Sequence, residues 1–452
     1  MKDFFTPNEF RLGSDSKCIQ AAVAAAHDAG CGKVVIPAYN ERTGAYLWSI
    51  DETIRLPSHT YLLIDNAHLR MADGSICRMF ENSNAVQEIG KTAEGLQEDI
   101  IIQGQGRALL DGGLHNDIRE RNPNRDKLPR VTNNLTIYFH NVCNFKVDGL
   151  TIRDQRWWSM AFMYAWEGVI SNLRFEITLK SHRQSLESPW KNQDGIDLRI
   201  GCHNIQIFNI SGETCDDVIA LTALGSPENP GGFEMRNYCP HLNGDIFNVT
   251  IRNVVAFNNH CSMVRLLCHY GHRIYNIDID HLVDATPEGD EYDVEKCIRT
   301  ANCVKLGENN YHKNNPAWRA RHGDLHDITI SNVFSSALAA VVANCTAKNV
   351  TIRNVHVGKM GVHALAVSQI YAGVLSAVDN EENVTTLENI RMDGISYHSG
   401  HKGATPFFFA GLKAKNVTVE NLSLPKGTEL ITEVRPQAGS EPVRMEKVVY
   451  EA

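Results

Sequence analysis

Three aspartates in two short stretches have the residue type and the spacing for acid and base chemistry. Asp194 lies in the stretch 192–198, and Asp216 and Asp217 follow one strand-like unit later. The intervening residues 204–210 alternate between apolar and polar side chains, as a strand does. If this unit is one turn of a parallel β-coil, neighbouring coils lie about 4.8 Å apart, which brings the three carboxyl groups onto one patch of wall.

Clustered carboxyl groups suit the hydrolysis of a glycosidic bond. One group protonates the departing oxygen and another activates a water molecule. Neighbouring carboxylates do not all ionise easily, so we expect one to keep its proton near neutral pH and to act as the acid. Consecutive strand residues point to opposite faces, so Asp216 and Asp217 face one cleft only if the chain bends there.

Other interpretations of these aspartates stay open. Stacked aspartates also form the metal site of a calcium-dependent polysaccharide lyase, in which an arginine or lysine abstracts the proton, and a carbohydrate-binding β-helix needs no catalysis. Surface aspartates also cap turns, but the run 218–221 after Asp217 is apolar, as beside a core. Asp197 lies in the same stretch as Asp194, and we expect it on the far side of the coil or in a turn.

Several later residues are candidates for contact with a substrate. His260 lies one coil beyond the aspartates once an intervening loop is allowed for, and His269 and His272 are its rivals. Arg265 lies in the apolar stretch 263–267, where a cation needs a carboxylate or a substrate as partner, unless the strand is at the surface.

Aromatic residues and long loops complete the candidate site. Trp157 and Trp158 are either a sugar platform, because aromatic faces stack on pyranose rings, or buried aromatics at a strand end. Two loop-rich regions, 115–132 and 224–243, interrupt the strand pattern. Because long excursions from a solenoid commonly wall its binding cleft, we expect the second region to border the site.

The composition is that of a soluble globular chain. Of the 452 residues, 43% are hydrophobic and 21% are charged, and the formal net charge is −9. Affinity for nucleic acid or for an anionic membrane needs a basic field, so we expect neither as a partner. The sequence has no apolar run of about 18 residues that would span a bilayer.

The twelve cysteines are scattered, without a CxxC pair, and mostly stand within apolar strand segments. This pattern is typical of reduced packing residues and not of a disulfide framework. The first residues also lack the apolar segment of a signal peptide. We therefore expect a cytoplasmic protein, or a secreted one if a leader has been removed, and no cofactor in the hydrolytic interpretation.

The amino-terminal residues predict a helix followed by strands. Residues 14–29 have helical periodicity, with Ser14 or Asp15 as N-cap and Gly30 as stop signal. Strands are expected at 32–37 and 61–69. The apolar face of the helix consists of Ile19, Ala22, Val23 and Ala26. Such a helix covers the open edge of a coil, which otherwise invites pairing with other chains.

From about residue 99 onward one unit recurs, an aliphatic alternation that ends in a small polar residue and another aliphatic one. Copies begin at Asn204, Asn248, Asn276, Asp327, Asn349, Asn389 and Asn416. Further asparagines stand where each strand must bend, because Asn tolerates left-handed backbone geometry and stacked amides bond from coil to coil. These are Asn209, Asn253, Asn332, Asn354 and Asn421.

The repeats predict an all-β fold, a single-stranded right-handed parallel β-helix with a short N-terminal capping helix. A β-sandwich is the alternative, but Asn-Gly hairpin signals are scarce. We expect a single domain over residues 1–452, because a solenoid grows along one axis. Its parts are a lead-in over 1–75, coils over 99–425 and a tail over 426–452.

The order of the motifs resembles that of the polygalacturonases of glycoside hydrolase family 28. The Asn-x-Asp element of that family corresponds to residues 192–194, its Asp-Asp element to Asp216 and Asp217, and its histidine to His260. The resemblance implies a pectin lyase-like β-helix that hydrolyses an oligo- or polysaccharide with inversion of the anomeric carbon. It also implies that Asp216 is the acid and that Asp194 and Asp217 hold the water.

The chain departs from this family in three places. Gln193 stands where the family has threonine, and Asn259 and Cys261 replace the glycines beside the histidine. The family's Arg-Ile-Lys element, which grips uronate carboxylates, has its nearest counterpart at 302–307, where one cation, Lys305, is kept. We therefore expect a pectin-related or modified oligosaccharide as substrate. The expected substrate contacts are Asn192, Arg265, His269, Lys305, Trp157 and Trp158.

Overall fold

The computed structural model describes residues 2–114, 116, 118, 131–178, 192–225, 237–269, 271–288, 299–308, 316–371, 374–376, 384–398, 401 and 405–451. The chain divides into two compact units, and each is described by itself. Unit 1 comprises Met1–Cys215 and Pro230–Asn243, and unit 2 comprises Asp216–Asn229 and Gly244–Ala452.

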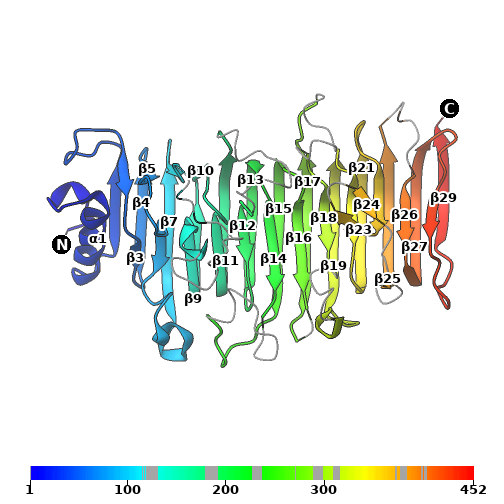
Figure 1. The fold of residues 1–452 in the computed structure, drawn as a ribbon, viewed down its shortest axis with the longest axis horizontal. Coiled ribbons are helices and arrows are strands. Elements are labelled where there is room, and N and C mark those ends of the chain that lie inside the picture. Colours follow the sequence, from blue (N-terminus) through cyan, green and yellow to red (C-terminus); the bar gives the residue numbers. More distant parts are fainter. Residues whose placement is uncertain are drawn as a thin grey trace. The chain divides into compact units, whose positions relative to one another are not determined.

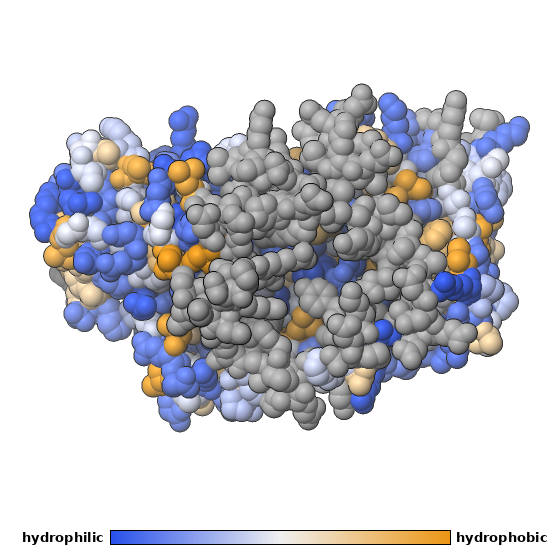
Figure 2. Space-filling model, viewed as in Figure 1, coloured by the Kyte–Doolittle hydropathy of each residue, from blue (hydrophilic) through white to orange (hydrophobic). Residues whose placement is uncertain are grey.

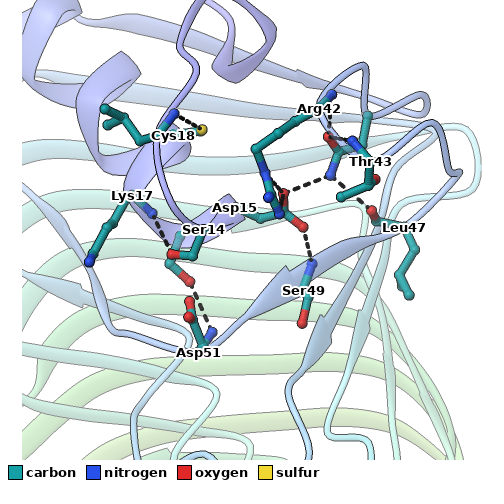
Figure 3. Close-up of polar contacts among 12 residues, drawn as sticks. Ser14, Asp15, Lys17, Cys18, Arg42, Thr43, Leu47, Ser49 and Asp51 are labelled. Atoms are coloured by element: carbon teal, nitrogen blue, oxygen red, sulfur yellow. Dashed lines mark hydrogen bonds and ion pairs between the residues drawn. The ribbon is translucent and has the colours of Figure 1, made fainter.

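Unit 1 opens with the predicted helix, α1 (Asp15–Asp28). The Ser14 side chain accepts a hydrogen bond from the Lys17 N–H and so caps its first turn. Figure 3 shows how the buried Asp15 carboxylate ties this turn to the next strands: it accepts from Arg42 Nη2 at 2.6 Å and from the Ser49 N–H at 2.8 Å. A buried carboxylate is retained only with such partners.

The apolar face of α1 packs on the first strands, β1 (Lys33–Pro37), β2 (Trp48–Ile50) and β3 (Ile54–Leu56), at the amino-terminal end of unit 1 (Figure 1). The buried residues of this face include the four that the sequence predicts: Ile19, Ala22, Val23 and Ala26. The prediction of a helix that covers the first coil is therefore confirmed.

The remaining strands of unit 1 pair in parallel with the strand one coil earlier, as in the rows β1–β4–β7–β9–β11–β13 and β2–β5–β8–β10. They are β4 (Thr60–Asp65), β5 (His68–Met71), β6 (Phe80–Asn82), β7 (Gln97–Gln105), β8 (Leu109–Asp111), β9 (Ile137–Asp148), β10 (Thr151–Arg153), β11 (Met160–Glu176), β12 (Ile196–Leu198) and β13 (His203–Thr214).

Unit 2 repeats the same arrangement, with its strands in sequence order from green to red in Figure 1. Two parallel rows alternate along the chain. The first is β15 (Ile246–Asn258), β17 (Ile274–Asp284), β19 (Leu325–Ser335), β21 (Ala347–Val357), β25 (Thr385–Tyr397), β27 (Leu412–Pro425) and β29 (Arg444–Glu451). The second is β14 (Ile219–Ala223), β16 (Ser262–Cys268), β18 (Asn302–Leu306), β20 (Ala339–Ala343), β22 (His363–Val367), β26 (Phe407–Ala410) and β28 (Ile431–Val434).

Register places like residues on top of one another along each row. One buried file in unit 2 is made only of β-branched aliphatic side chains, which suit a pleated surface. Its members are Val249, Ile277, Ile328, Val350, Ile390 and Val417. In β27 buried positions alternate with partly exposed ones, except at the corners Asn416 and Asn421, and this alternation puts such files on the inner face of the coils.

Asparagine ladders form the corners of the coils, as predicted. Asn354 has a left-handed backbone, with φ at +52°, and its Nδ2 donates to Asn332 Oδ1 one coil earlier at 3.0 Å. A second ladder lies at the positions that the sequence marks as starts of the repeats. Its bonds include Asn389 Nδ2 to Asn349 Oδ1 at 3.1 Å and Asn416 Nδ2 to Asn389 Oδ1 at 3.0 Å. These start residues are also left-handed corners, which the sequence analysis did not anticipate.

The predicted fold class, a right-handed parallel β-helix with a capping helix, is confirmed. The expected limits of the coils, 99–425, are too narrow. Parallel pairing already begins with β1 and β4 and continues to β29, within the segments expected as lead-in and tail. Strands β2 and β3 of the lead-in have only three residues each, which is too short for the repeat pattern to reveal them.

The described surface carries few large apolar groups. On the face shown in Figure 2, apolar side chains of the described residues form only small groups among hydrophilic ones. The eleven cysteines in the described ranges are free thiols, eight of them buried. None of the described helices is long and apolar enough to cross a membrane.

The ladder leads to a stability prediction at Asn354. Asn354→Ala removes the side-chain hydrogen bond to Asn332. It also leaves a residue with a Cβ atom in left-handed geometry, so we expect the free energy of unfolding to fall by about 1–2 kcal/mol. Asn354→Gly loses only this hydrogen bond, because glycine adopts left-handed geometry without strain, so we expect a smaller fall in the free energy of unfolding. Urea denaturation followed by circular dichroism measures both, and equal losses would contradict the role assigned to the backbone.

Candidate active site

Asp216 and Asp217 lie where the chain leaves strand geometry. Because β13 ends at Thr214 and β14 begins at Ile219, the predicted bend is present. Asp217 is 1% exposed, and its Oδ1 accepts a hydrogen bond from the Ser262 N–H at 2.9 Å. Asp216 is half-buried, and its Oδ1 accepts the Asp217 N–H at 2.8 Å. The two neighbouring carboxyl groups therefore have different surroundings.

A cation on β16 faces the buried carboxylate. Arg265 Nε lies 2.8 Å from Asp217 Oδ2, and 13% of the arginine side chain is exposed. Arg265 thus has the carboxylate partner that a cation in an apolar strand requires.

Lys305 lies beside Arg265, and one further carboxylate bridges the two cations. Strands β16 and β18 pair with Arg265 directly opposite Lys305. Glu308, just beyond the end of β18, places Oε1 3.0 Å from Lys305 Nζ and Oε2 3.7 Å from Arg265 Nη1. We call Asp217, Arg265, Glu308 and Lys305 the charge quartet, because negative and positive groups alternate along it.

Burial and charge set the acidity of the two carboxyl groups in the quartet. Burial raises the pKa of Asp217 to about 6, with Arg265 opposing the rise and Asp216 adding to it. Burial also acts to raise the pKa of Glu308, but the attraction of Lys305 and Arg265 outweighs it and lowers that pKa below its ordinary value. The carboxyl group with the raised pKa is thus Asp217, whereas the resemblance assigns the acid to Asp216.

Among the residues that the structure describes, two groups of side chains have the spacing of metal ligands. Ligand atoms of Asp216, Asp217 and Cys261 lie within 4.8 Å of one another. Calcium takes six to eight oxygen ligands, whereas this set contains a thiol and a carboxylate already paired with Arg265, so it does not fit the calcium alternative. The second group, His59 with two neighbouring acidic residues of unit 1, is largely exposed.

The three candidate histidines have different surroundings. His260 is next in sequence to a neighbour of the aspartates, whereas His269 and His272 contact the backbone of Gly225. His260 precedes Cys261, which lies beside Asp216 and Asp217, and it has a left-handed backbone with φ at +69°. His269 is buried, and its Nε2 accepts the Gly225 N–H at 3.2 Å. His272 Nε2 donates to the Gly225 carbonyl oxygen at 2.6 Å. The contacts of His269 and His272 are therefore structural, and His269 is not an open substrate contact.

In unit 1, Asp194 lies immediately before β12 and is buried, and its carbonyl oxygen accepts the Ser159 N–H at 2.8 Å. Asn192 is a half-buried left-handed corner with φ at +62°. Gln193 is buried, and its side-chain Nε2 donates to the backbone carbonyl oxygen of Gln155. In return, Gln155 Nε2 donates to the backbone carbonyl oxygen of Gln193 at 3.0 Å. Gln193 thus fixes the turn that carries Asp194.

Of the two positions expected for Asp197, the one in a turn is wrong. It lies within β12, fully buried and not in a turn, and its Oδ1 is 3.5 Å from Arg199 Nη1. Arg199, two residues later and also buried, is the cation that accompanies this carboxylate in the interior.

Trp157 and Trp158 are packing residues, so the sugar platform predicted for them is also wrong. They are 3% and 8% exposed, and their rings stack on each other with centroids 4.0 Å apart. The guanidinium of Arg199 lies 4.4 Å from the Trp158 ring. Strand-end aromatics are commonly buried in this way, and here they belong to a core cluster with Leu135 and Tyr138.

The structure thus brings four candidates together in unit 2: Asp216, Asp217, Arg265 and Lys305. Asp194 belongs to unit 1, and its approach to Asp216 and Asp217 stays a prediction. Sequence analysis missed Glu308, although a glutamate three residues after Lys305 at a strand end was a usable signal. Of the loops expected to border the site, residues 115, 117, 119–130 and 226–236 lie outside the described residues.

Comparison with known proteins gives one family. Residues 83–227 match the model of glycosyl hydrolases family 28, and this region contains Asp194, Asp216 and Asp217 but not Arg265 or Lys305. No curated protein matches the chain in sequence.

Solved structures share the fold at 13% identity. PfbA, a surface adhesin of Streptococcus pneumoniae, matches with a TM-score of 0.55 over 97% of this chain and 95% of that chain, at 13% identity. A tailspike protein mutant of E. coli bacteriophage HK620, in complex with pentasaccharide, matches with a TM-score of 0.54 over 99% of this chain and 78% of that one, also at 13% identity. The family 28 exopolygalacturonase of Yersinia enterocolitica gives a TM-score of 0.48, with 13% identity and coverage of 99% and 78%.

The family match and the shared fold agree with the motif order read from the sequence. The chain therefore shares the parallel β-helix fold of these solved structures, and its residues 83–227 are similar to glycosyl hydrolases family 28.

Proposed function

We propose that this protein is a glycoside hydrolase that cleaves an O-glycosidic bond in an oligo- or polysaccharide. The observation that carries the proposal is the Asp216-Asp217 pair, in which a buried, ion-paired carboxyl group adjoins a partly exposed one inside the family 28 region. Acid and base catalysis of this reaction needs two carboxyl groups in different roles, and the two members of this pair differ in exposure and in partners.

We assign the acid to Asp216 and the water-holding base to Asp217 together with Asp194, with inversion at the anomeric carbon. Asp216 is the partly exposed member of the pair and so is the one that reaches a departing oxygen. Asp217 is fixed by the Ser262 N–H and by Arg265, which favours an ionised, oriented carboxylate. The part of Asp194 rests on the motif order alone.

The proposed partner is a carbohydrate, with a pectin-related or modified oligosaccharide as the expected class. The net charge of −9 argues against nucleic acid or anionic membranes as partners, because binding to them needs a basic surface. We further propose a cytoplasmic location, which rests on the scattered, free cysteines and awaits fractionation of cells that express the protein.

Loss of the acid is the first prediction. Asp216→Asn keeps the shape of the side chain but cannot give a proton, so we expect kcat to fall about 10²- to 10⁴-fold. Reducing-sugar release from a panel of defined oligosaccharides measures it. Asp278→Asn, the same change at an exposed position of unit 2, is the matched control and is expected to keep full activity.

Full turnover by Asp216→Asn would refute the assignment of the acid. Activity that EDTA abolishes, with release of an unsaturated sugar that absorbs ultraviolet light, would instead support the calcium-dependent lyase.

Inversion is the second prediction. A water molecule held by Asp217 and Asp194 attacks the face opposite the departing oxygen, so the first-formed sugar has the anomeric configuration opposite to that of the cleaved bond. NMR spectra recorded in the first minutes of the reaction, before mutarotation, identify that anomer. A first product with the retained configuration would require a covalent intermediate and would exclude this mechanism.

The third prediction is a pH dependence set by Asp217. A base works only when ionised, so kcat/KM is expected to rise with pH through about 6, the pKa of Asp217. Arg265 opposes the rise of this pKa, so its removal in Arg265→Gln raises the pKa of Asp217 further. The rise of kcat/KM with pH, the acidic limb of the profile, therefore moves to higher pH. Arg252→Gln, an exposed arginine of β15, is the control and leaves the limb in place.

Activity that falls as pH rises through this range would show the opposite assignment, with Asp217 as the acid. An unshifted limb in Arg265→Gln would show that another group controls it.

A further inference from the structure

The charge quartet contains two cations that the fold forces side by side. Arg265 and Lys305 lie directly opposite each other on β16 and β18, and parallel neighbours of this kind are about 4.8 Å apart. Their side chains are only 13% and 10% exposed, so water screens their repulsion weakly. Like charges opposite one another on a sheet destabilise it, so this pair needs anions.

The protein supplies both anions itself. Asp217 contacts Arg265, and Glu308 contacts Lys305 and Arg265 with its two carboxylate oxygens. The lowered pKa of Glu308 means that this carboxylate is ionised at neutral pH. Two negative groups therefore face two positive groups, and the quartet carries no net charge. Asp216 adds a further carboxyl group next to it.

An acidic sugar at this position would compete with Glu308. Its carboxylate would meet cations that are already paired, together with Asp216, Asp217 and Glu308 as repelling groups. A neutral sugar presents hydroxyl groups, which bond to charged side chains without disturbing the ion pairs. The balance of charge thus favours the neutral ring.

We propose that Glu308 determines specificity: by occupying Arg265 and Lys305, it makes the position beside Asp217 select a neutral sugar residue over a uronate. This inference rests on the proposed function, because it names the class of ring that the proposed site accepts. Specificity of this kind comes from a repulsive element as much as from an attractive one.

The test compares two trisaccharides that differ only at C6, α-1,4-linked galactotriose and trigalacturonate. Binding is measured by isothermal titration calorimetry in the Asp216→Asn background, so that neither ligand is consumed. We expect the protein with Glu308 to bind the neutral trisaccharide more tightly. In Glu308→Gln the two cations are released, and the ratio of affinities should move at least about tenfold toward the acidic one.

Two further variants keep the test interpretable. Glu388→Gln is the matched control, because Glu388 also bridges two lysines of unit 2, Lys348 and Lys415, and it should leave the ratio unchanged. If Glu308→Gln does not fold, the double variant Lys305→Gln with Glu308→Gln removes one charge of each sign. It should fold and keep the neutral preference, because no cation is left without a partner.

The inference is overturned if the protein with Glu308 prefers trigalacturonate, if Glu308→Gln leaves the ratio unchanged or binds neither ligand, or if the double variant prefers the acidic ligand. These readouts do not depend on turnover. A shift in binding without hydrolysis of any oligosaccharide would therefore refute the proposed function alone, and hydrolysis with an unchanged ratio would refute the role of Glu308 alone.

Discussion

Parallel register between coils is the constraint on which this structure depends. Each residue meets its equivalent on the next coil at about 4.8 Å, so side chains come in files and not as single contacts. A file of valine and isoleucine makes a continuous core, as from Val249 to Val417. The same register stacks polar residues at a repeated position on top of one another. Their side chains must then find hydrogen-bond or ion-pair partners.

Amides and charges meet this requirement in different ways. An asparagine amide carries both a donor and an acceptor, so Asn349, Asn389 and Asn416 bond to their own kind along a ladder. Two cations have no such complementarity. Arg265 and Lys305 therefore recruit carboxylates from outside their file, Asp217 from the bend before β14 and Glu308 from the loop after β18.

This difference explains where reactive groups gather in unit 2. Strand interiors give regular files, whereas bends and loops deliver groups that the register does not repeat, such as Asp216, Asp217 and Glu308. The family 28 match covers the two aspartates and ends before both cations. Proposed chemistry and proposed specificity therefore come from different stretches of the chain.

The sequence alone determined the β-helix, the capping helix, the asparagine corners and the candidate aspartates, because each depends on local periodicity and residue type that repeat along the chain. It did not reveal that Trp157 and Trp158 are buried, that Asp197 pairs with Arg199, or that Glu308 bridges Arg265 and Lys305. Only the tertiary structure decided these, because burial and charge pairing depend on which strands pack around a residue. The bends and loops that bring Asp217 and Glu308 to Arg265 leave no periodic trace in the sequence.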